Sequence, residues 1–189
     1  MNYSSGDLFL KGPNWQLNAC VGRNGGPYDF AAYYRGYFKA ARHVIAAVAD
    51  GDPSLDLLIY PTIYLYRHAF ELGLKHLSRS LLIAGESSKD YVKSHKLSTL
   101  WRDIETQLRR HPTLFEEAQI DSMGHLLADL DILDSSAEVF RFPETKAGDA
   151  HLQDRSIINY VRLSPLSEAE AIFDRWSYCI DGIAEYGTA

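Results

Sequence analysis

The stretch IYPTIYLYRHAFELGLKHLSRSLLI, residues 59–83, decides the fold because its spacing predicts one long and largely apolar helix. At about 100° per residue, four ionisable side chains and two tyrosines fall within an arc of roughly 100°. We call this set the polar strip, and it consists of Tyr60, Tyr64, Arg67, His68, Glu71 and Lys75. An exposed helix would carry a broader polar face. Charges on a helix suited to burial must pair with one another, with other helices or with a ligand, so the polar strip is the first place to look for function.

The composition of the 189-residue chain is that of an ordinary globular domain. Hydrophobic residues make up 46% and charged residues 23%, which argues against extensive disorder. The net charge of −6 argues against a whole-surface grip on nucleic acid but leaves room for a local basic groove. Cys20 and Cys179 lack the spacing of a metal or redox motif. With no leader-like start and no long uncharged apolar run, we expect a soluble, cytoplasmic protein with reduced thiols.

The remaining chain predicts an all-α protein, an antiparallel bundle of four to five helices. Glycines mark residues 1–26 as an irregular arm, which Trp15 and Leu17 can pin to the bundle, and residues 27–189 form a single helical-bundle domain. Apolar residues at helical spacing predict further helices. They are expected over residues 27–49, from Leu97 to Leu108, over 113–134, and from a capping box at Ser167–Glu170 to about residue 187.

The segment before the last helix has a different character. Residues 139–143 and 157–163 are rich in β-branched and aromatic residues and are separated by polar positions around Gly148. They predict a small β hairpin or an ordered loop that crosses the bundle.

Two interpretations of the polar strip remain open. Arg67, Glu71 and Lys75 follow one another at i, i+4 and i+8, so they can form a structural ladder of ion pairs. Alternatively the strip lines a cleft, where Arg67 can grip a phosphate or carboxylate with two hydrogen bonds. His68 is either a hydrogen-bonded structural residue or a proton-transfer group. Its i, i+3 spacing to Glu71 also fits a helical metal site, but no second motif of that kind occurs in the chain.

Two residues outside the helix can join the strip. His95 precedes the third predicted helix, where its imidazole can cap that helix or point back at the strip, and we expect capping. Arg141 is bracketed by Phe140 and Phe142, so it is either an exposed arginine or one carried by aromatic packing into a polar site.

Three segments together resemble bacterial proteins of the HEPN-like (higher eukaryotes and prokaryotes nucleotide-binding) helical-bundle group. They are YLYRHAFELGLK (64–75), SHKLSTLW (94–101) and FRFP (140–143). The resemblance implies an antiparallel bundle that dimerises, and an RNA-processing, toxin or defence ribonuclease or an inactive binding module. It also implies that the strip faces the central groove or the dimer interface. Active members usually carry an arginine followed by a histidine after four to six intervening residues; this motif is absent from the sequence, where Arg67 and His68 are adjacent.

The sequence therefore predicts a polar inter-helix site for RNA or another phosphate-bearing ligand. Candidates for catalysis are Arg67, His68 and His95, and candidates for ligand binding are Tyr64, Glu71, Lys75 and Arg141. In a ribonuclease, a histidine would transfer the proton while Arg67 stabilised the phosphorane charge. The competing hypothesis is a non-enzymatic interaction or regulatory module, in which a buried charge network fixes helix packing or a dimer interface. We expect no cofactor and no metal, a homodimer, RNA or a nucleotide as ligand, a partner protein encoded nearby, and no membrane association.

Overall fold

Five α-helices make up most of the computed structural model, which describes residues 9–22, 24, 26 and 28–186. The helices are α1 (Phe30–Ala49), α2 (Leu55–Ile83), α3 (Leu97–Leu108), α4 (Glu117–Leu133) and α5 (Ser164–Tyr186). Two short 3-10 helices, Trp15–Leu17 and Tyr160–Leu163, accompany them. The described part of the chain contains no strand, so the all-α prediction is confirmed there.

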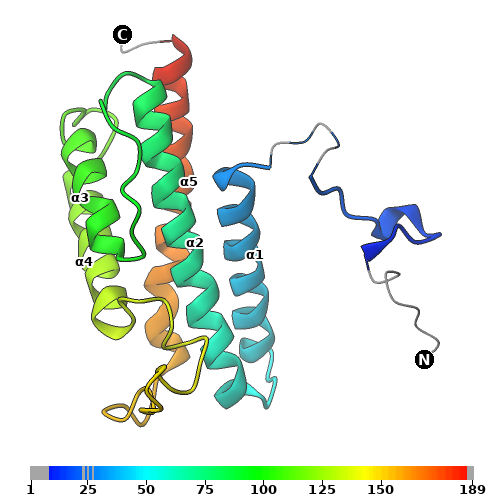
Figure 1. Ribbon diagram of the computed structural model, residues 1–189. Helices are drawn as coiled ribbons and strands as arrows, with labels where there is room; N and C mark the ends of the chain where they lie inside the picture. Colours follow the sequence, from blue (N-terminus) through cyan, green and yellow to red (C-terminus); the bar gives the residue numbers. More distant parts are fainter. Residues whose placement is uncertain (1–8, 23, 25, 27, 187–189) are drawn as a thin grey trace.

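Helix α2 is central to the bundle because it packs against α1, α3 and α5. Figure 1 shows α1 running antiparallel beside α2, with α3 and α4 on the other side. The turn between α1 and α2 passes through Gly51, whose φ of 97° lies in the left-handed region that glycine adopts without strain. A side chain on α2 can therefore meet residues from several other helices.

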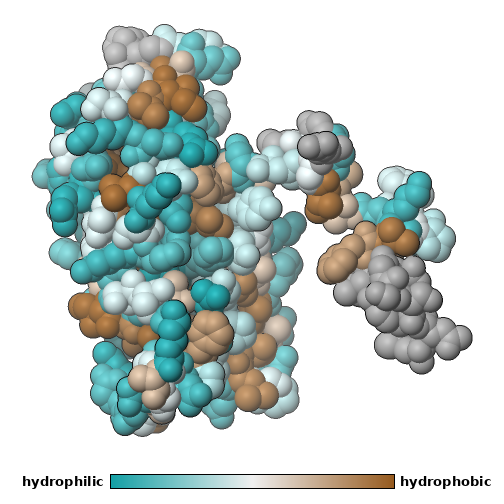
Figure 2. All heavy atoms as spheres, viewed as in Figure 1, coloured by the Kyte–Doolittle hydropathy of each residue, from teal (hydrophilic) through white to brown (hydrophobic). Residues whose placement is uncertain are grey.

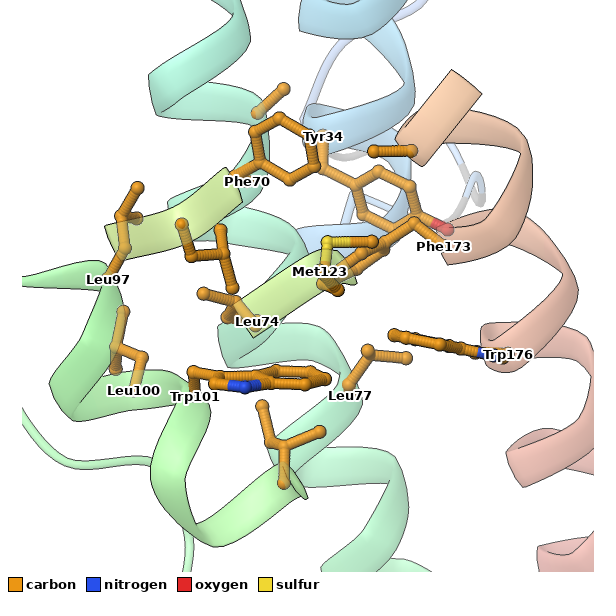
Figure 3. Close-up of a cluster of buried hydrophobic side chains, with 14 of the residues drawn as sticks. Tyr34, Phe70, Leu74, Leu77, Leu97, Leu100, Trp101, Met123, Phe173 and Trp176 are labelled. Atoms are coloured by element: carbon orange, nitrogen blue, oxygen red, sulfur yellow. The ribbon is translucent and has the colours of Figure 1, made fainter. Parts of the chain in front are cut away.

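The core holds α2, α3 and α5 together through large aromatic side chains (Figure 3). Trp101 of α3 and Trp176 of α5 stack with their ring centroids 5.8 Å apart. Phe173 of α5 lies against Gly73 of α2, where an added Cβ would be only 2.6 Å from the ring. Gly73 thus permits a close approach of α2 and α5.

The start of α2 differs from the sequence prediction. The helix begins at Leu55, about one turn before residue 59, so Pro61 lies inside it and not in its first turn. Proline lacks the backbone N–H that would otherwise donate to the Leu57 carbonyl, and one residue further on the Thr62 hydroxyl donates to the Leu58 carbonyl at 2.6 Å. Pro61 is exposed, so its ring points away from the core. Helix α4 also differs, starting at Glu117 and not at residue 113.

The predicted capping box at the start of the last helix was also wrong. Helix α5 begins at Ser164, and Pro165 occupies its first turn, where the missing N–H of proline has no cost. Ser167 is therefore inside the helix, and its hydroxyl is 2.7 Å from the Tyr66 hydroxyl of α2. Glu170 is buried, with a carboxylate oxygen 3.3 Å from Arg42 Nε.

The connection from α4 to α5 is an ordered loop without a hairpin. Its only regular pairing within the described residues is a single antiparallel bridge between Glu144 and Ala150. Phe140 is buried against the helices, while Ile157 is 84% exposed. The two β-favouring segments line a cavity between them instead of pairing. A segment with strand propensity forms a strand only when it pairs with another strand, and within the described residues neither of these two segments does so.

Residues 9–22 of the N-terminal arm lie away from the bundle in Figures 1 and 2. Trp15 is 77% and Leu17 81% exposed, so the expectation that these side chains pin the arm down was wrong. Cys20 in the arm and Cys179 in α5 are both free thiols. Among the described residues, no helix combines the length and the apolar character needed to cross a bilayer.

Candidate functional site

The polar strip divides into a buried part and a part at the surface. Arg67 has no exposed area and Glu71 has 2%, so both lie inside the bundle. His68 and Tyr64 are partly exposed, and Tyr60, nearer the start of α2, is 46% exposed. Helix α2 thus carries a buried ion pair directly behind polar and aromatic side chains that reach solvent.

Arg67 connects α2 to two distant segments of backbone. Its Nε donates to the Asp134 carbonyl at 2.7 Å, and its Nη2 donates to the His95 carbonyl at 2.6 Å. Its Nη1 donates to Glu71 Oε2 at 3.3 Å, one turn along the same helix. A planar guanidinium can serve three directions at once, which a lysine ammonium on a flexible stem cannot do with the same geometry. Arg67 therefore holds the end of α4 and the start of α3 against α2.

The second oxygen of Glu71 faces two further partners. Oε1 accepts from Lys75 Nζ at 2.7 Å and lies 3.0 Å from His95 Nδ1. Burial alone raises the pKa of the Glu71 carboxyl, but the hydrogen bonds and charges of Lys75 and His95 outweigh it and lower the pKa overall. Glu71 is therefore an ionised, buried carboxylate at neutral pH.

His95 is oriented by that carboxylate yet open to solvent. Because Glu71 can only accept, His95 Nδ1 carries the proton in this contact and Nε2 is the nitrogen left for other partners. The His95 side chain is 72% exposed. A buried carboxylate that fixes the tautomer of a solvent-facing imidazole is a geometry suited to general acid–base chemistry.

The expectation that His95 caps the third helix was wrong. Asp131 of α4 caps α3 instead, its carboxylate accepting from the backbone N–H groups of Leu97 (2.9 Å) and Ser98 (2.7 Å). Asp134, three residues further on, accepts from the Glu138 N–H and lies 3.8 Å from Arg67 Nε. Sequence reasoning missed both aspartates. Asp131 is one of four acidic residues in α4, and Asp134 follows the last residue of that helix, so neither position stood out in the sequence.

His68 lies in an aromatic setting beside this network. Its ring stacks on Tyr64 at 5.5 Å between centroids and meets Tyr37 of α1 edge-on at 4.5 Å. Burial lowers the pKa of His68, Glu71 opposes this effect, and the nearby cations Lys75, Arg67 and Arg141 add to it. His68 is therefore neutral at physiological pH and can accept a proton or a hydrogen bond.

Arg141 approaches the same surface from the loop between α4 and α5. Its guanidinium lies over the Tyr64 ring at 5.8 Å and over the Phe142 ring at 5.1 Å, and the residue is exposed. Two aromatic rings hold the planar cation, and no residue in the described part of the chain accepts a hydrogen bond from its N–H groups, which can therefore meet an anion. The structure thus brings Arg141 to Tyr64 and His68, while Arg67 stays buried beneath them.

The surface that results can offer proton transfer, positive charge and aromatic rings within a small area. We call it the α2 face, defined by Tyr37, Tyr64, His68, Lys75, His95 and Arg141. Within the described residues no group of three or more His, Cys, Asp or Glu side chains has the arrangement of a metal site. Both oxygens of Glu71 are taken by cations or by His95, so the i, i+3 pair with His68 is not arranged as a ligand pair.

Comparison with known proteins adds no family assignment. No protein-family model matches the chain, and no curated protein or solved structure is significantly similar to it.

Proposed function

We propose that the protein binds RNA or another phosphate-bearing ligand on the α2 face. The observation that carries this proposal is the ordered imidazole of His95, held by a buried carboxylate beside Lys75 and close to neutral His68. Arg141 adds a free guanidinium and Tyr64 an aromatic ring. Cations bind phosphate and aromatic rings stack on bases, so the combination favours single-stranded RNA over duplex.

If the protein cleaves RNA, His95 is the best placed general base or acid. Its Nε2 is directed to solvent and its tautomer is fixed by Glu71. His68 is the second candidate for proton transfer, and Arg141 replaces buried Arg67 as the cation that meets the phosphate. In this scheme Arg67 is a positioning residue, because it holds the His95 backbone and touches no ligand.

The setting that we propose is that of a HEPN-like protein of the cytoplasm. Such a protein would act as a homodimer in a toxin-antitoxin or defence system, with a partner encoded nearby. The five-helix bundle and the exposed His95, which precedes α3 and contacts Glu71 of the long second helix, support this assignment. The adjacent Arg67 and His68 favour binding over cleavage in the manner of active members.

Binding is tested with a short, 5′-labelled single-stranded RNA by fluorescence anisotropy, at about 50 mM and about 200 mM salt. Lys75→Ala, His95→Ala and Arg141→Ala should each weaken binding several-fold, whereas His125→Ala, an exposed histidine of α4, should leave the affinity unchanged. Circular dichroism checks that all variants fold. Affinities equal to that of the wild type in all three variants would reject the α2 face as the binding site.

Cleavage is tested separately on a denaturing gel with the same RNA. Loss of a general acid or base lowers the rate by about a hundredfold or more, so cleavage by the wild type should be nearly absent in His95→Ala. RNA that is bound but stays intact would retain the binding proposal and reject the catalytic one.

A second function is favoured by the burial of Arg67 and Glu71. A network that ties three segments together can serve a non-enzymatic interaction or regulatory module, in which the charges only fix helix packing. This alternative predicts that Arg67→Ala lowers stability or dimerisation while RNA binding is absent in every variant, the wild type included.

A further inference from the structure

A cleft adjoins the α2 face at the end formed by the first turns of α2. Its volume is about 780 Å³, in the range of small-molecule sites. One wall is the segment Leu55 to Tyr60 of α2, and the other two are residues 139–143 and 151–160 of the connection to α5. The Tyr160 hydroxyl donates to the Leu55 carbonyl at 3.2 Å and so ties the connection to α2 on one side of the cleft.

Flat and apolar side chains line the cleft and remain open to solvent. Phe142 is 49% exposed, Tyr60 46% and Ile157 84%, although all three are large hydrophobic residues. Ile59 and Leu152 are partly buried beside them. Apolar surface left uncovered in a concave site is typical of a ligand site, and aromatic rings favour a flat ligand.

The polar groups of the cleft favour a ligand that carries a negative charge and also has a polar atom able to form a hydrogen bond. Arg141, Arg155 and the Asp56 carboxylate line it, and Arg155 Nε lies 3.7 Å from the carboxylate of the neighbouring Asp154. Arg141 is therefore the cation that the cleft offers to an anion. His151 Nε2 is buried at the cleft wall and has no hydrogen-bond partner among the described residues. An unpartnered buried nitrogen is unfavourable unless a ligand or water meets it.

We propose that this cleft holds the base and sugar of a nucleotide whose phosphate lies on Arg141. Phe142 and Tyr60 would stack on the base, and His151 Nε2 would bond its polar edge. Arg141 belongs to both the cleft and the α2 face, because its guanidinium also lies over Tyr64. The phosphate would therefore be directed toward His68 and His95. This inference rests on the proposed function and names the ligand as a nucleotide, either free or as one residue of single-stranded RNA.

The base-binding part is tested by isothermal titration calorimetry with 5′-AMP, 5′-UMP, ribose 5-phosphate and inorganic phosphate. One stacked base typically strengthens binding by about tenfold or more. The wild type should therefore bind a mononucleotide at least about tenfold more tightly than ribose 5-phosphate. Equal affinities for these two probes would overturn the inference.

Variants locate the effect in the cleft. Phe142→Ala should remove most of the preference for the mononucleotide, and Phe142→Trp should keep it because the ring is retained. Tyr178→Ala is the matched control, since Tyr178 is 80% exposed on α5 and does not line the cleft. Arg141→Ala should weaken all phosphate-bearing probes, with Arg102→Ala of α3 as its control. A preference that survives in Phe142→Ala would place the base elsewhere.

Two further arms separate this inference from the proposed function. If labelled RNA binds through Lys75 and His95 but Phe142→Ala has the affinity of the wild type, the proposed function stands and the cleft inference fails. If 5′-AMP binds in the cleft and RNA does not bind, the cleft is a site for a free nucleotide and the RNA proposal fails. Benzoate is an additional probe of a flat anion without sugar or phosphate, and an affinity equal to that of 5′-AMP would reject the nucleotide as the ligand.

Discussion

Arg67 concentrates several interactions in one buried side chain. Its guanidinium donates to two backbone carbonyls and one carboxylate, and none of its surface is exposed. The positive charge is matched by Glu71 and by the Asp134 carboxylate at 3.8 Å. An ion pair of this kind is a weak source of net stability while intact, but removing one partner leaves the other charge buried and unpaired.

Arg67→Ala should therefore destabilise the fold by about 3–5 kcal/mol. The measurement is urea unfolding followed by circular dichroism at neutral pH. Arg79→Ala on the same helix is the control, because Arg79 forms an exposed pair with Asp90 and should change the free energy of unfolding by about 1 kcal/mol or less. Similar effects for the two variants would show that the buried network does not hold the bundle together.

His68 makes stability depend on pH in a direction that follows from its pKa. Burial lowers the pKa of His68 below the ordinary 6.5, and burial does the same for His76. As the pH falls, the two histidines are protonated in the unfolded state before they are protonated in the folded state. Their contribution to the free energy of unfolding is therefore fully present above pH 6.5 and is lost as the pH falls through their folded-state pKa values.

We expect the free energy of unfolding to be lower at about pH 5.5 than at about pH 7.5, and His68→Phe should reduce that difference. Urea unfolding at the two pH values measures it, and His125→Phe is the exposed control. Imidazole titration by NMR checks the cause. A His68 pKa above 6.5 would contradict the expected direction.

At the scale of elements, two glycines in helix interiors allow the effect of helix packing on stability to be compared with the effect of helix propensity. Gly73 faces Phe173 with no room for a Cβ, whereas Gly36 of α1 has nothing within 4 Å of the corresponding position. Gly73→Ala should destabilise by about 1–3 kcal/mol because it forces α2 and α5 apart. Gly36→Ala should stabilise by about 0.5–1 kcal/mol through its higher helix propensity. Thermal unfolding measures both, and a stabilising Gly73→Ala would show that the contact between α2 and α5 is loose.

Helices could be predicted from local sequence, but the ends of helices and the caps could not. Apolar spacing identified α1 to α5 because each buries one face. The capping box at Ser167 and the start at residue 59 were both predicted from local pattern, yet α2 begins at Leu55 and α5 at Ser164. The cap of α3 comes from Asp131, more than thirty residues away in the chain. Such a tertiary cap leaves no local pattern.

At the scale of the molecule, the candidate site combines residues that sequence could and could not place. The polar strip of α2 was visible from its periodicity, but helical spacing alone could not show that Arg67 is buried while His68 is at the surface. That division depends on α1, which supplies Tyr37, and on the two loops that supply His95 and Arg141. The cleft lined by residues 139–160 and the first turns of α2 was equally invisible, because it arises where the two β-favouring segments line a cavity instead of pairing.

The N-terminal arm gives a prediction for the whole molecule. Phe9, Trp15 and Leu17 are largely exposed, and the arm is held by local contacts such as the Gly12 N–H to Asn18 Oδ1 bond at 2.8 Å. An arm that buries little apolar surface on the bundle adds little to its stability. Deleting residues 1–26 should therefore change the Tm of the monomer by no more than about 2 °C in differential scanning calorimetry.

Sedimentation of the full-length and the shortened protein is the accompanying measurement, because large apolar side chains left in solvent can also dock on a second copy. A lower Tm together with a loss of dimer would show that the arm stabilises an assembly, and a lower Tm in a protein that is monomeric throughout would show that it packs on its own bundle.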